Sequence, residues 1–302
     1  MELSIIIVNY NSGDLLKKCV DSIFRWIKYL DYEVIVVDNH STDNSMAFIK
    51  ETRVSNIRTI INSSNHGFSK ANNIGIKQAS GNVILLLNPD TILTSDVIGP
   101  MYKHIMDDIS IGVLGSRLIF PDGSLQTSAY AYTSLGKTIL QLLAVPLRPL
   151  SAFFSRIKFF RHISVLKPYL LRYSSDKSLL EADFVTGACM MFRKSVIDTV
   201  GLMDESFFMY YEDEDLCRRI KMEGLKIIQD PEISIVHDFG WGKRGANIFL
   251  IRERYKSLLY YCNKYYGNRP IYNAVFIALN TFIFWISILF ARMRLIYNKK
   301  AQ

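Results

Sequence analysis

The sequence predicts an α/β protein built on a mostly parallel sheet with helices on both faces. Two observations carry this prediction. In residues 1–90, short apolar runs rich in Val and Ile alternate with segments of helical spacing, and strands of that composition are typical of parallel sheets covered on both faces. Each apolar run also ends in polar residues. Because ligands bind at the carboxyl ends of such strands, these polar residues are the first candidates for a site.

The elements of the first half alternate in order. Strands are expected at 3–10, 32–39, 57–63 and 82–90. Helices are expected at 15–27, where apolar side chains share one face, at 41–51 with Ser41 or Thr42 as the N-cap, and at 69–79. No turn between them has the glycine pattern of a dinucleotide-binding fold or a P-loop, so both classes are disfavoured.

The second half is less regular. A strand, a Pro-Asp-Gly turn and another strand are expected over 112–126. A strand leading into a helix is expected over 182–198, a helix opening at the four acids of 212–215, and further strands over 224–240.

The segment 131–180 carries most of the net charge of +8, with eight Lys and Arg residues against a single Asp. Basic residues interleaved with Leu, Phe and Ile favour a membrane surface with anionic lipids. A nucleic-acid partner is disfavoured, because the segment has long aliphatic runs and no known nucleic-acid module. A buried helical insertion with snorkelling Lys and Arg side chains is the alternative.

The stretch 271–290 has 20 residues without a charge and is followed by basic residues, which is long enough to span a bilayer. Its Asn, Thr and Ser residues leave a single span, a surface helix and an oligomer-forming helix all open. The prediction is membrane association through this helix and the basic segment. The four cysteines are scattered and form no C-x-x-C pair, so neither zinc nor disulfides are indicated. A reducing setting fits best, and the first residues do not have the pattern of a signal peptide.

Two acids lie at strand ends. Asp38 and Asp90 would point into one crevice, where one carboxylate can accept hydrogen bonds from a ligand and the other can help to hold Mg²⁺ or Mn²⁺. The alternative is that both are ordinary turn residues. His237 follows another strand and is a candidate metal ligand, and Lys243 and Arg244 lie in a Gly-rich loop where they could counter phosphate charge.

Seven features occur in the order found in one known family: VNYN (8–11), VVDNHSTDNS (36–45), NHGFSKANNIG (65–75), LLLNPD (85–90), VTGACMMFRK (185–194), FFMYYEDEDLCRR (207–219) and the late His237. Together they resemble a family 2 glycosyltransferase with the GT-A fold, and within that family the rhamnosyltransferase-like members that build bacterial surface polysaccharides. The resemblance covers about residues 3–245. It implies an inverting transfer of a sugar from a nucleotide-diphosphate donor.

The resemblance also implies roles for residues. Asp38 would contact the nucleobase, and the metal would be held by Asp90 and His237, with Asn88-Pro89-Asp90 in place of the Asp-x-Asp found in many members. The donor would be bound by Asn9, Tyr10, Asn11, Asp38, Asn65, Gly67, Asn72, Asn73, Asn88, Asp90, Lys243 and Arg244. The acceptor would be bound by Gly187, Ala188, Tyr211 and Glu212.

The acids of 212–215 divide into two pairs. The resemblance makes Asp213 the base that takes the acceptor hydroxyl proton, with Glu212 beside it. If a helix begins here, Glu214 and Asp215 stand at i,i+4 from Arg218 and Arg219 and can form ion pairs with them. The alternative is that all four are acids that favour a helix N-terminus.

The expected organisation has four parts. They are a nucleotide-sugar-binding half at 1–130, a basic apolar membrane-facing insertion at 131–180, an acceptor-binding and catalytic half at 181–262, and a hydrophobic helix with a basic tail at 263–302. The expected substrates are dTDP-rhamnose and a polyprenyl-diphosphate-linked saccharide, at the cytoplasmic face of the plasma membrane, with a homodimer possible. Alternatives are a UDP-sugar donor, a processive polysaccharide synthase of the same fold, and a non-catalytic nucleotide-sugar-binding protein.

Overall fold

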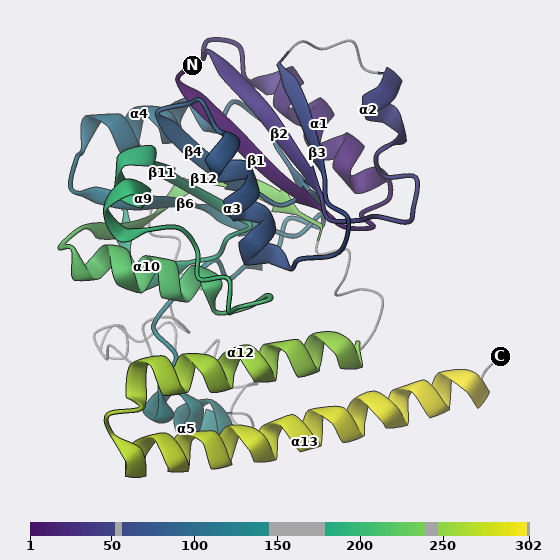
Figure 1. The fold of residues 1–302 in the computed structure, drawn as a ribbon, viewed down its shortest axis with the longest axis vertical. Helices are drawn as coiled ribbons and strands as arrows, with labels where there is room; N and C mark the ends of the chain where they lie inside the picture. The colour runs from purple at the N-terminus through teal and green to yellow at the C-terminus, as the bar shows by residue number, and fades with distance from the viewer. Residues whose placement is uncertain (52–55, 145–178, 239–246, 301–302) are drawn as a thin grey trace.

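The structure, a computed structural model, describes residues 1–51, 56–144, 179–238 and 247–300. A 10-stranded sheet with helices on both faces forms one part, and three helices form a separate layer beside it (Figure 1). The main strand order is β3-β2-β1-β4-β11-β6-β12-β5. The prediction of an α/β fold with a mostly parallel sheet flanked by helices and a C-terminal apolar helix is therefore confirmed, and the sheet is mixed because antiparallel strands join it.

The first half has the predicted alternation. Its strands are β1 (Leu3–Asn9), β2 (Tyr32–Asp38), β3 (Ile57–Ile61) and β4 (Val83–Leu87), and its helices are α1 (Asp14–Trp26), α2 (Ala47–Glu51) and α3 (Phe68–Gln78). β1 pairs in parallel with β2 and β4, and β2 pairs in parallel with β3.

Successive side chains of β1 enter two different cores, as strand geometry requires. Ile5 and Ile7 pack with apolar residues of α1 and of α4 (Ile98–Asp107). Ile6 packs on the opposite face with residues of α3, α9 (Lys194–Val200) and α10 (Glu212–Met222). Burial on both faces explains why the strands are almost continuously apolar.

The second half adds antiparallel strands to the sheet. β11 (Cys189–Arg193) runs antiparallel to both β4 and β6 (Ile111–Ile119), and β12 (Lys226–His237) runs parallel to β6. The short strands β5 (Thr91–Ile92), β7 (Leu125–Gln126) and β9 (Leu180–Glu181) also join this sheet, whereas β8 (Ala129–Tyr130) and β10 (Phe184–Val185) pair with each other in a separate two-stranded sheet. The predicted strand pair over 112–126 and the helix opening at 212 are confirmed, whereas 224–240 contains one long strand.

The predicted helix 41–51 was wrong at its start. α2 begins at Ala47, because the hydroxyl groups that could cap an earlier start have other partners. Ser41 Oγ accepts hydrogen bonds from Asn9 Nδ2 at 3.0 Å and from the Asn11 backbone N–H at 3.0 Å.

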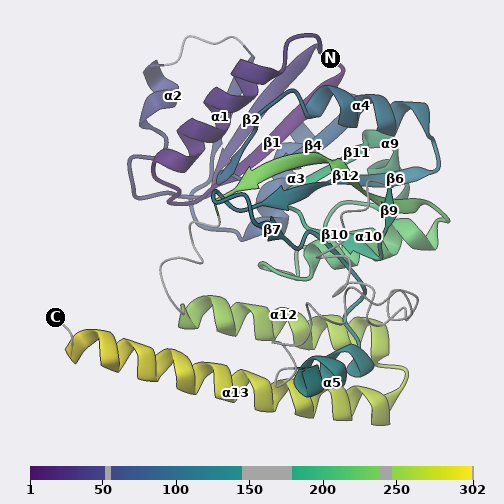
Figure 2. The same cartoon turned by 180° about the vertical axis from the view of Figure 1, so that it is seen from behind.

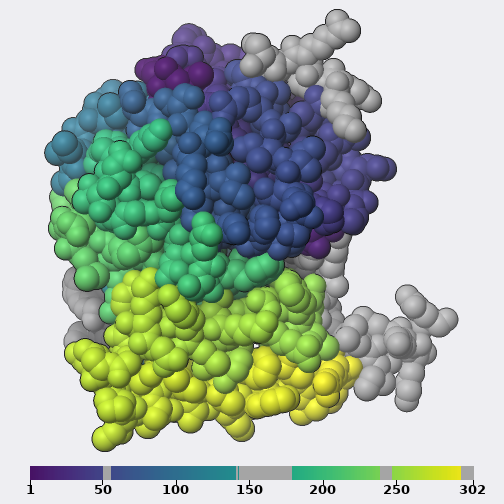
Figure 3. All heavy atoms as spheres, in the orientation of Figure 1, coloured from purple at the N-terminus to yellow at the C-terminus, as the bar shows by residue number. Residues whose placement is uncertain are grey.

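The separate layer consists of α5 (Leu135–Ala144), α12 (Ile248–Tyr266) and α13 (Pro270–Lys300). α12 and α13 run antiparallel, and α5 lies beside them (Figure 2). In the space-filling view the layer covers the end of the molecule below α10 (Figure 3). Within α13, Pro270–Met293 is long and apolar enough to cross a membrane, with a mean hydropathy of 2.2 and 17% of its most apolar window buried. Of the basic segment 131–180, residues 145–178 lie outside the described residues.

Candidate active site

The carboxyl ends of β1 and β2 place Asn9 beside Asp38 in register. Asn9 is completely buried, and its Nδ2 donates to Asp38 Oδ1 at 2.8 Å and to Ser45 Oγ at 2.9 Å. Asp38 also accepts from the Ser41 backbone N–H at 3.1 Å. Asn9 therefore fixes the orientation of the Asp38 carboxylate, which is where the sequence predicted a nucleobase contact.

Asn39 links this strand end to the turn before α3. Its Nδ2 donates to Asn65 Oδ1 at 2.8 Å, and its Oδ1 accepts from the His66 backbone N–H at 3.0 Å. The next residue, Gly67, has φ +82°, and a Cβ there would lie 2.3 Å from the Phe208 carbonyl oxygen. Only glycine tolerates both that backbone conformation and that close approach.

Two predicted donor contacts on α3 have structural partners. The Nδ2 of Asn72 donates to the Phe68 carbonyl at 3.0 Å. Asn73 donates to the Met203 carbonyl at 2.8 Å and accepts from the Met203 backbone N–H at 3.0 Å. Both asparagines are 1% exposed. They hold the site's surroundings in place, and direct contact with a donor stays a prediction for them.

Asp90 and His237 come together, as predicted for a metal pair. Asp90 Oδ1 lies 3.1 Å from His237 Nε2. The other ring nitrogen, Nδ1, lies 2.8 Å from Gln126 Oε1. Since that oxygen can only accept, Nδ1 donates to it, and in the neutral ring Nε2 presents its lone pair to Asp90.

This pair fits a divalent cation. Two ligands held side by side on an octahedral Mg²⁺ at about 2.0–2.1 Å lie about 3 Å apart, close to the observed separation. A metal-binding imidazole also commonly donates its second N–H to an oxygen, as His237 does to Gln126. Within the described ranges no third His, Cys, Asp or Glu completes a cluster with these two. Donor phosphate oxygens and water would therefore have to supply the remaining ligands.

The backbone before α10 is unusual. Tyr210 and Tyr211 have φ values of 67° and 71°, and the other non-glycine residues with positive φ in the described ranges are Asn11 and His40. Such left-handed conformations are costly for ordinary side chains and concentrate at functional sites. All four lie at the strand ends and the helix start predicted to form the site.

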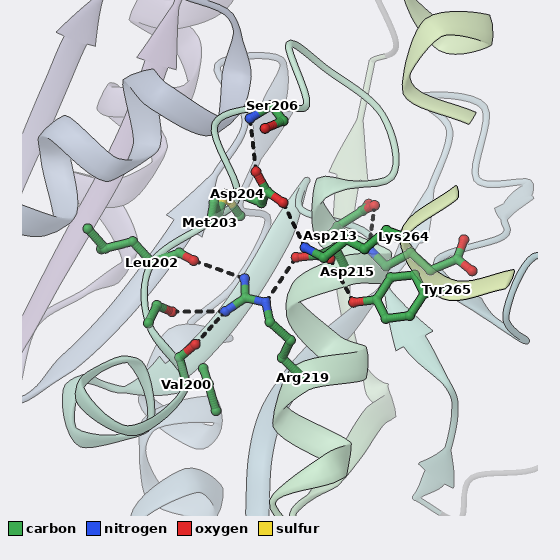
Figure 4. Close-up of polar contacts among 12 residues, drawn as sticks. Val200, Leu202, Met203, Asp204, Ser206, Asp213, Asp215, Arg219, Lys264 and Tyr265 are labelled. Carbon is green, nitrogen blue, oxygen red and sulfur yellow. Dashed lines mark hydrogen bonds and ion pairs between the residues drawn. The ribbon is translucent and has the colours of Figure 1, made fainter. Parts of the chain in front are cut away.

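The four acids that open α10 have different environments. Asp215 is completely buried, and its carboxylate contacts Arg219 Nε at 2.9 Å, Lys264 Nζ at 2.6 Å and Tyr265 OH at 2.7 Å. Figure 4 shows this cluster together with Asp204, which contacts the same lysine at 2.7 Å. The predicted pair of Asp215 and Arg219 is confirmed, and the cluster ties α10 to α12.

The predicted pair of Glu214 and Arg218 was wrong. Glu214 is 2% exposed and accepts from Thr133, through the hydroxyl at 2.8 Å and also through the backbone N–H. Arg218 instead donates to Tyr261 OH at 2.9 Å and lies over the ring of Tyr265 at 4.0 Å. Tertiary partners therefore replace the local i,i+4 pair on both sides.

Asp213 is half-buried in the first turn of α10. Its Oδ2 accepts from the Gly187 backbone N–H at 3.2 Å, and its Oδ1 accepts from the Glu214 N–H at 2.8 Å. Burial raises the pKa of Asp213 even though these hydrogen bonds oppose the shift. A carboxylate that is fixed in place and has a raised pKa suits proton abstraction near neutral pH. Gly187, predicted to bind the acceptor, thus contacts the predicted base directly.

Glu212 is 6% exposed. Burial, and then the neighbouring Asp213 charge, raise its pKa well above the usual range. Because the folded-state pKa exceeds the unfolded one, the contribution of Glu212 to stability is complete below the unfolded pKa of about 4.3 and is lost as the pH rises toward the folded value.

We therefore expect Glu212→Gln, which removes this titration, to stabilise the protein increasingly as the pH rises from 4 to 8. The gain in the free energy of unfolding should be at least about 1 kcal/mol at pH 8 and near zero at pH 4. Thermal unfolding across this range measures it, with Glu223→Gln at the exposed C-cap of the same helix as the control. A gain that does not change with pH would contradict the raised pKa.

Comparisons with known proteins define the family. The model of the family described as glycosyl transferase family 2 matches residues 4–201, about two thirds of the chain. The chain belongs to glycosyl transferase family 2. The strand ends at Asn9, Asp38 and Asp90 and the Gly187 contact to Asp213 all lie within or against this matched region.

Two curated relatives of this family 2 chain illustrate its similarity. It is 27% identical over 242 residues to the low-salt glycan biosynthesis hexosyltransferase Agl10 of Haloferax volcanii, covering 78% of this chain and 67% of that protein. It is 25% identical over 249 residues to the N-acetylglucosaminyl-diphospho-decaprenol L-rhamnosyltransferase of Mycobacterium tuberculosis, covering 78% and 75%. By contrast, the match to the O-antigen biosynthesis protein RfbC of Myxococcus xanthus spans only 18% of that longer protein.

Solved structures support the fold. The mannosyltransferase PcManGT from Pyrobaculum calidifontis, in complex with GDP-Man and Mn²⁺, has a TM-score of 0.58 at 15% identity, covering 100% of this chain and 76% of that one. GalNAc-T7 with UDP, GalNAc and Mn²⁺ has a TM-score of 0.57 at 15% identity, covering 78% and 44%. These likenesses confirm the GT-A fold.

Several residues in and around the candidate active site could not be predicted from the sequence. Gln126, Thr133 and Arg254 are far in sequence from the groups that they contact, and only the fold brings them together. Ser41, which contacts Asn9 and Asn11, was predicted instead to cap a helix. Lys243 and Arg244 lie outside the described residues, so their role stays a prediction.

Proposed function

We propose that this family 2 chain is an inverting glycosyltransferase that moves a sugar from a nucleotide-diphosphate donor to a lipid-linked saccharide acceptor in surface polysaccharide synthesis. The observation that carries the proposal is the fixed Asp213 carboxylate, held by the Gly187 and Glu214 amides at the start of α10. Asp38, Asp90 and His237 stand at the carboxyl ends of the neighbouring strands. A single displacement needs a general base for the acceptor hydroxyl and a site that holds the nucleotide diphosphate.

The residues divide the reaction between them. Asp38, oriented by Asn9, would accept hydrogen bonds from the nucleobase, and Asp90 with His237 would hold a divalent cation at the donor diphosphate. Asp213 accepts the proton of the acceptor hydroxyl as that oxygen attacks the anomeric carbon. A bound Mg²⁺ or Mn²⁺ supplies the positive charge that stabilises the departing diphosphate. The left-handed backbone of Tyr210 and Tyr211 precedes Glu212 and Asp213, which would face the acceptor.

The first candidate donor is dTDP-rhamnose. The name of the mycobacterial relative supports both the rhamnosyl group and a diphospho-polyprenol acceptor, while the name of Agl10 supports a hexosyltransferase in general. A UDP-sugar is the alternative donor, since solved neighbours contain UDP or GDP-Man.

The helical layer suits an enzyme that meets a lipid-linked substrate. α13 exposes large apolar side chains, among them Phe282, Trp285 and Phe290 at 61–63%. These exposed apolar side chains, together with the basic composition of the segment 131–180 in the sequence, favour the cytoplasmic membrane surface, with α13 lying in it or anchoring the chain to it.

The full chain in detergent, supplied with dTDP-rhamnose or UDP-sugars and a polyprenyl-diphosphate-linked saccharide, tests the proposal. We expect transfer with one donor, and at least a tenfold lower rate after chelation of divalent cations, restored by Mn²⁺ (about the effect of losing charge stabilisation at the diphosphate). Donor binding without transfer or hydrolysis would favour a non-catalytic binding protein. No binding and no turnover with any donor would remove the proposal altogether.

A further inference from the structure

Two cations from the helical layer stand beside the active site and have no role in the reaction described above. Lys137 lies on α5 and Arg254 on α12, so they come from different helices of the layer. Lys137 is half-buried and Arg254 is exposed. Among the described residues, neither forms an ion pair with a carboxylate: Lys137 Nζ donates to the Ala131 carbonyl, and Arg254 lies beside Tyr211.

Aromatic residues connect both cations to the catalytic helix. Lys137 Nζ lies 5.9 Å from the ring centre of Tyr130 and 5.8 Å from that of Phe184. Phe184 belongs to the short strand β10 that leads to Gly187, the residue whose amide binds Asp213. Arg254 contacts Tyr211, which directly precedes Glu212. Both cations are therefore next to the segments that position the base.

The charge of Arg254 also affects Lys137. The pKa of Lys137 is lowered, first by burial and also by the nearby positive charge of Arg254, against the opposing effect of Glu214 and Asp183. Like charges brought together in a partly buried place repel, and a bound anion removes that repulsion. An arginine and a lysine together are well suited to phosphate, the first by paired hydrogen bonds and the second as a point charge.

The residues around Lys137 and Arg254 indicate which kind of anion would bind there. α5 carries not only Lys137 but also the exposed apolar side chains Ile139 and Leu142, at 42% and 37%. α13, which also exposes large apolar side chains, lies in the same layer as α5 (Figures 1 and 2). Asp90 and His237, which suit the donor diphosphate, lie instead at the strand ends. An anion bound at the layer would thus have an apolar surface for an attached chain.

We propose that Lys137 and Arg254 form a binding site for the diphosphate of the lipid-linked acceptor, which places the acceptor sugar at Asp213. This rests on the proposed function, because it names the part of the acceptor that the enzyme recognises. The lipid chain would lie along α5 and α13, and the saccharide would extend past Tyr211 toward the base.

Binding of farnesyl diphosphate to the full chain in detergent, with a saturating nucleoside diphosphate present, tests the site. We expect Lys137→Met and Arg254→Met each to weaken binding about tenfold or more, which is the loss of one charge-assisted contact. The charge-retaining Lys137→Arg and Arg254→Lys should bind within a few-fold of the native chain, and so should Arg252→Gln on the exposed side of α12. Farnesol, which lacks the diphosphate, should bind equally to all variants.

Three results would overturn the proposal. They are unchanged farnesyl diphosphate binding in both methionine variants, an equal loss of farnesol binding, and weaker binding of the nucleoside diphosphate alone, which would assign the cations to the donor. If a methionine variant does not fold, the outcome rests on the neutral but polar Lys137→Gln and Arg254→Gln. Because this readout needs no donor turnover, its failure is separate from a failure of the proposed function.

Discussion

Replacing Asp213 by Asn should lower kcat by about 10²–10⁴-fold, the usual contribution of a positioned general base. The asparagine is nearly isosteric and can still accept one hydrogen bond from the Gly187 or Glu214 amide. It cannot take the acceptor proton. Steady-state transfer with saturating donor and acceptor measures the effect, and the dissociation constant of the nucleoside diphosphate should change by less than about threefold, since the donor contacts remain.

The matched control is Asp198→Asn, the same chemical change at an exposed position of α9, which should leave kcat unaltered. If Asp213→Asn turns over at the native rate, the base is another carboxylate. If it loses nucleotide binding and activity together, Asp213 has a structural role and the mechanism above is wrong.

Replacing Asp215 by Ala should destabilise the chain by about 3–5 kcal/mol, the cost of breaking a buried ion pair from one side. The carboxylate has no exposed surface and joins Arg219, Lys264 and Tyr265. Its loss leaves the cations of Arg219 on α10 and Lys264 on α12 close together without the carboxylate between them (Figure 4). Urea unfolding of the full chain in detergent measures the change.

Asp107→Ala is the control, because Asp107 forms an exposed i,i+4 pair with Lys103 at 2.7 Å and such pairs contribute less than about 1 kcal/mol. Equal losses in the two variants would contradict the view that the Asp215 cluster joins α12 to the catalytic helix. Loss of activity in Asp215→Ala at temperatures where the sheet remains folded would show that the helical layer positions Asp213.

The sheet could be predicted because its signals are local. Apolar runs on both faces mark β1, β2 and β4, and the polar residues that follow them mark the strand ends. The antiparallel partners β11 and β6 could be predicted as strands, but their places in the sheet depend on pairing between distant residues, such as Met190 with Gly115. No pattern within one segment specifies that pairing.

In the candidate site, too, local features could be predicted and contacts between distant residues could not. Asp38 and Asp90 were singled out because strand ends are visible in the sequence, and Asp213 because its motif resembles the Glu-Asp pair of the family. The partners of His237 and Glu214 could not be predicted in this way, because Gln126 and His237 are 111 residues apart and Thr133 and Glu214 are 81 apart. The erroneous Glu214–Arg218 pair has the same origin, since i,i+4 spacing states which residues could meet and burial decides which do.

The stereochemistry of the transferred sugar tests the central claim most directly. Proton NMR of the product formed from an anomerically pure nucleotide-sugar donor and the lipid-diphosphate acceptor reports both whether transfer occurs and on which face. A single displacement with Asp213 as the base predicts a glycoside of inverted anomeric configuration, which is absent with Asp213→Asn. A product that retains the donor configuration, or one formed equally well by the variant, would contradict it.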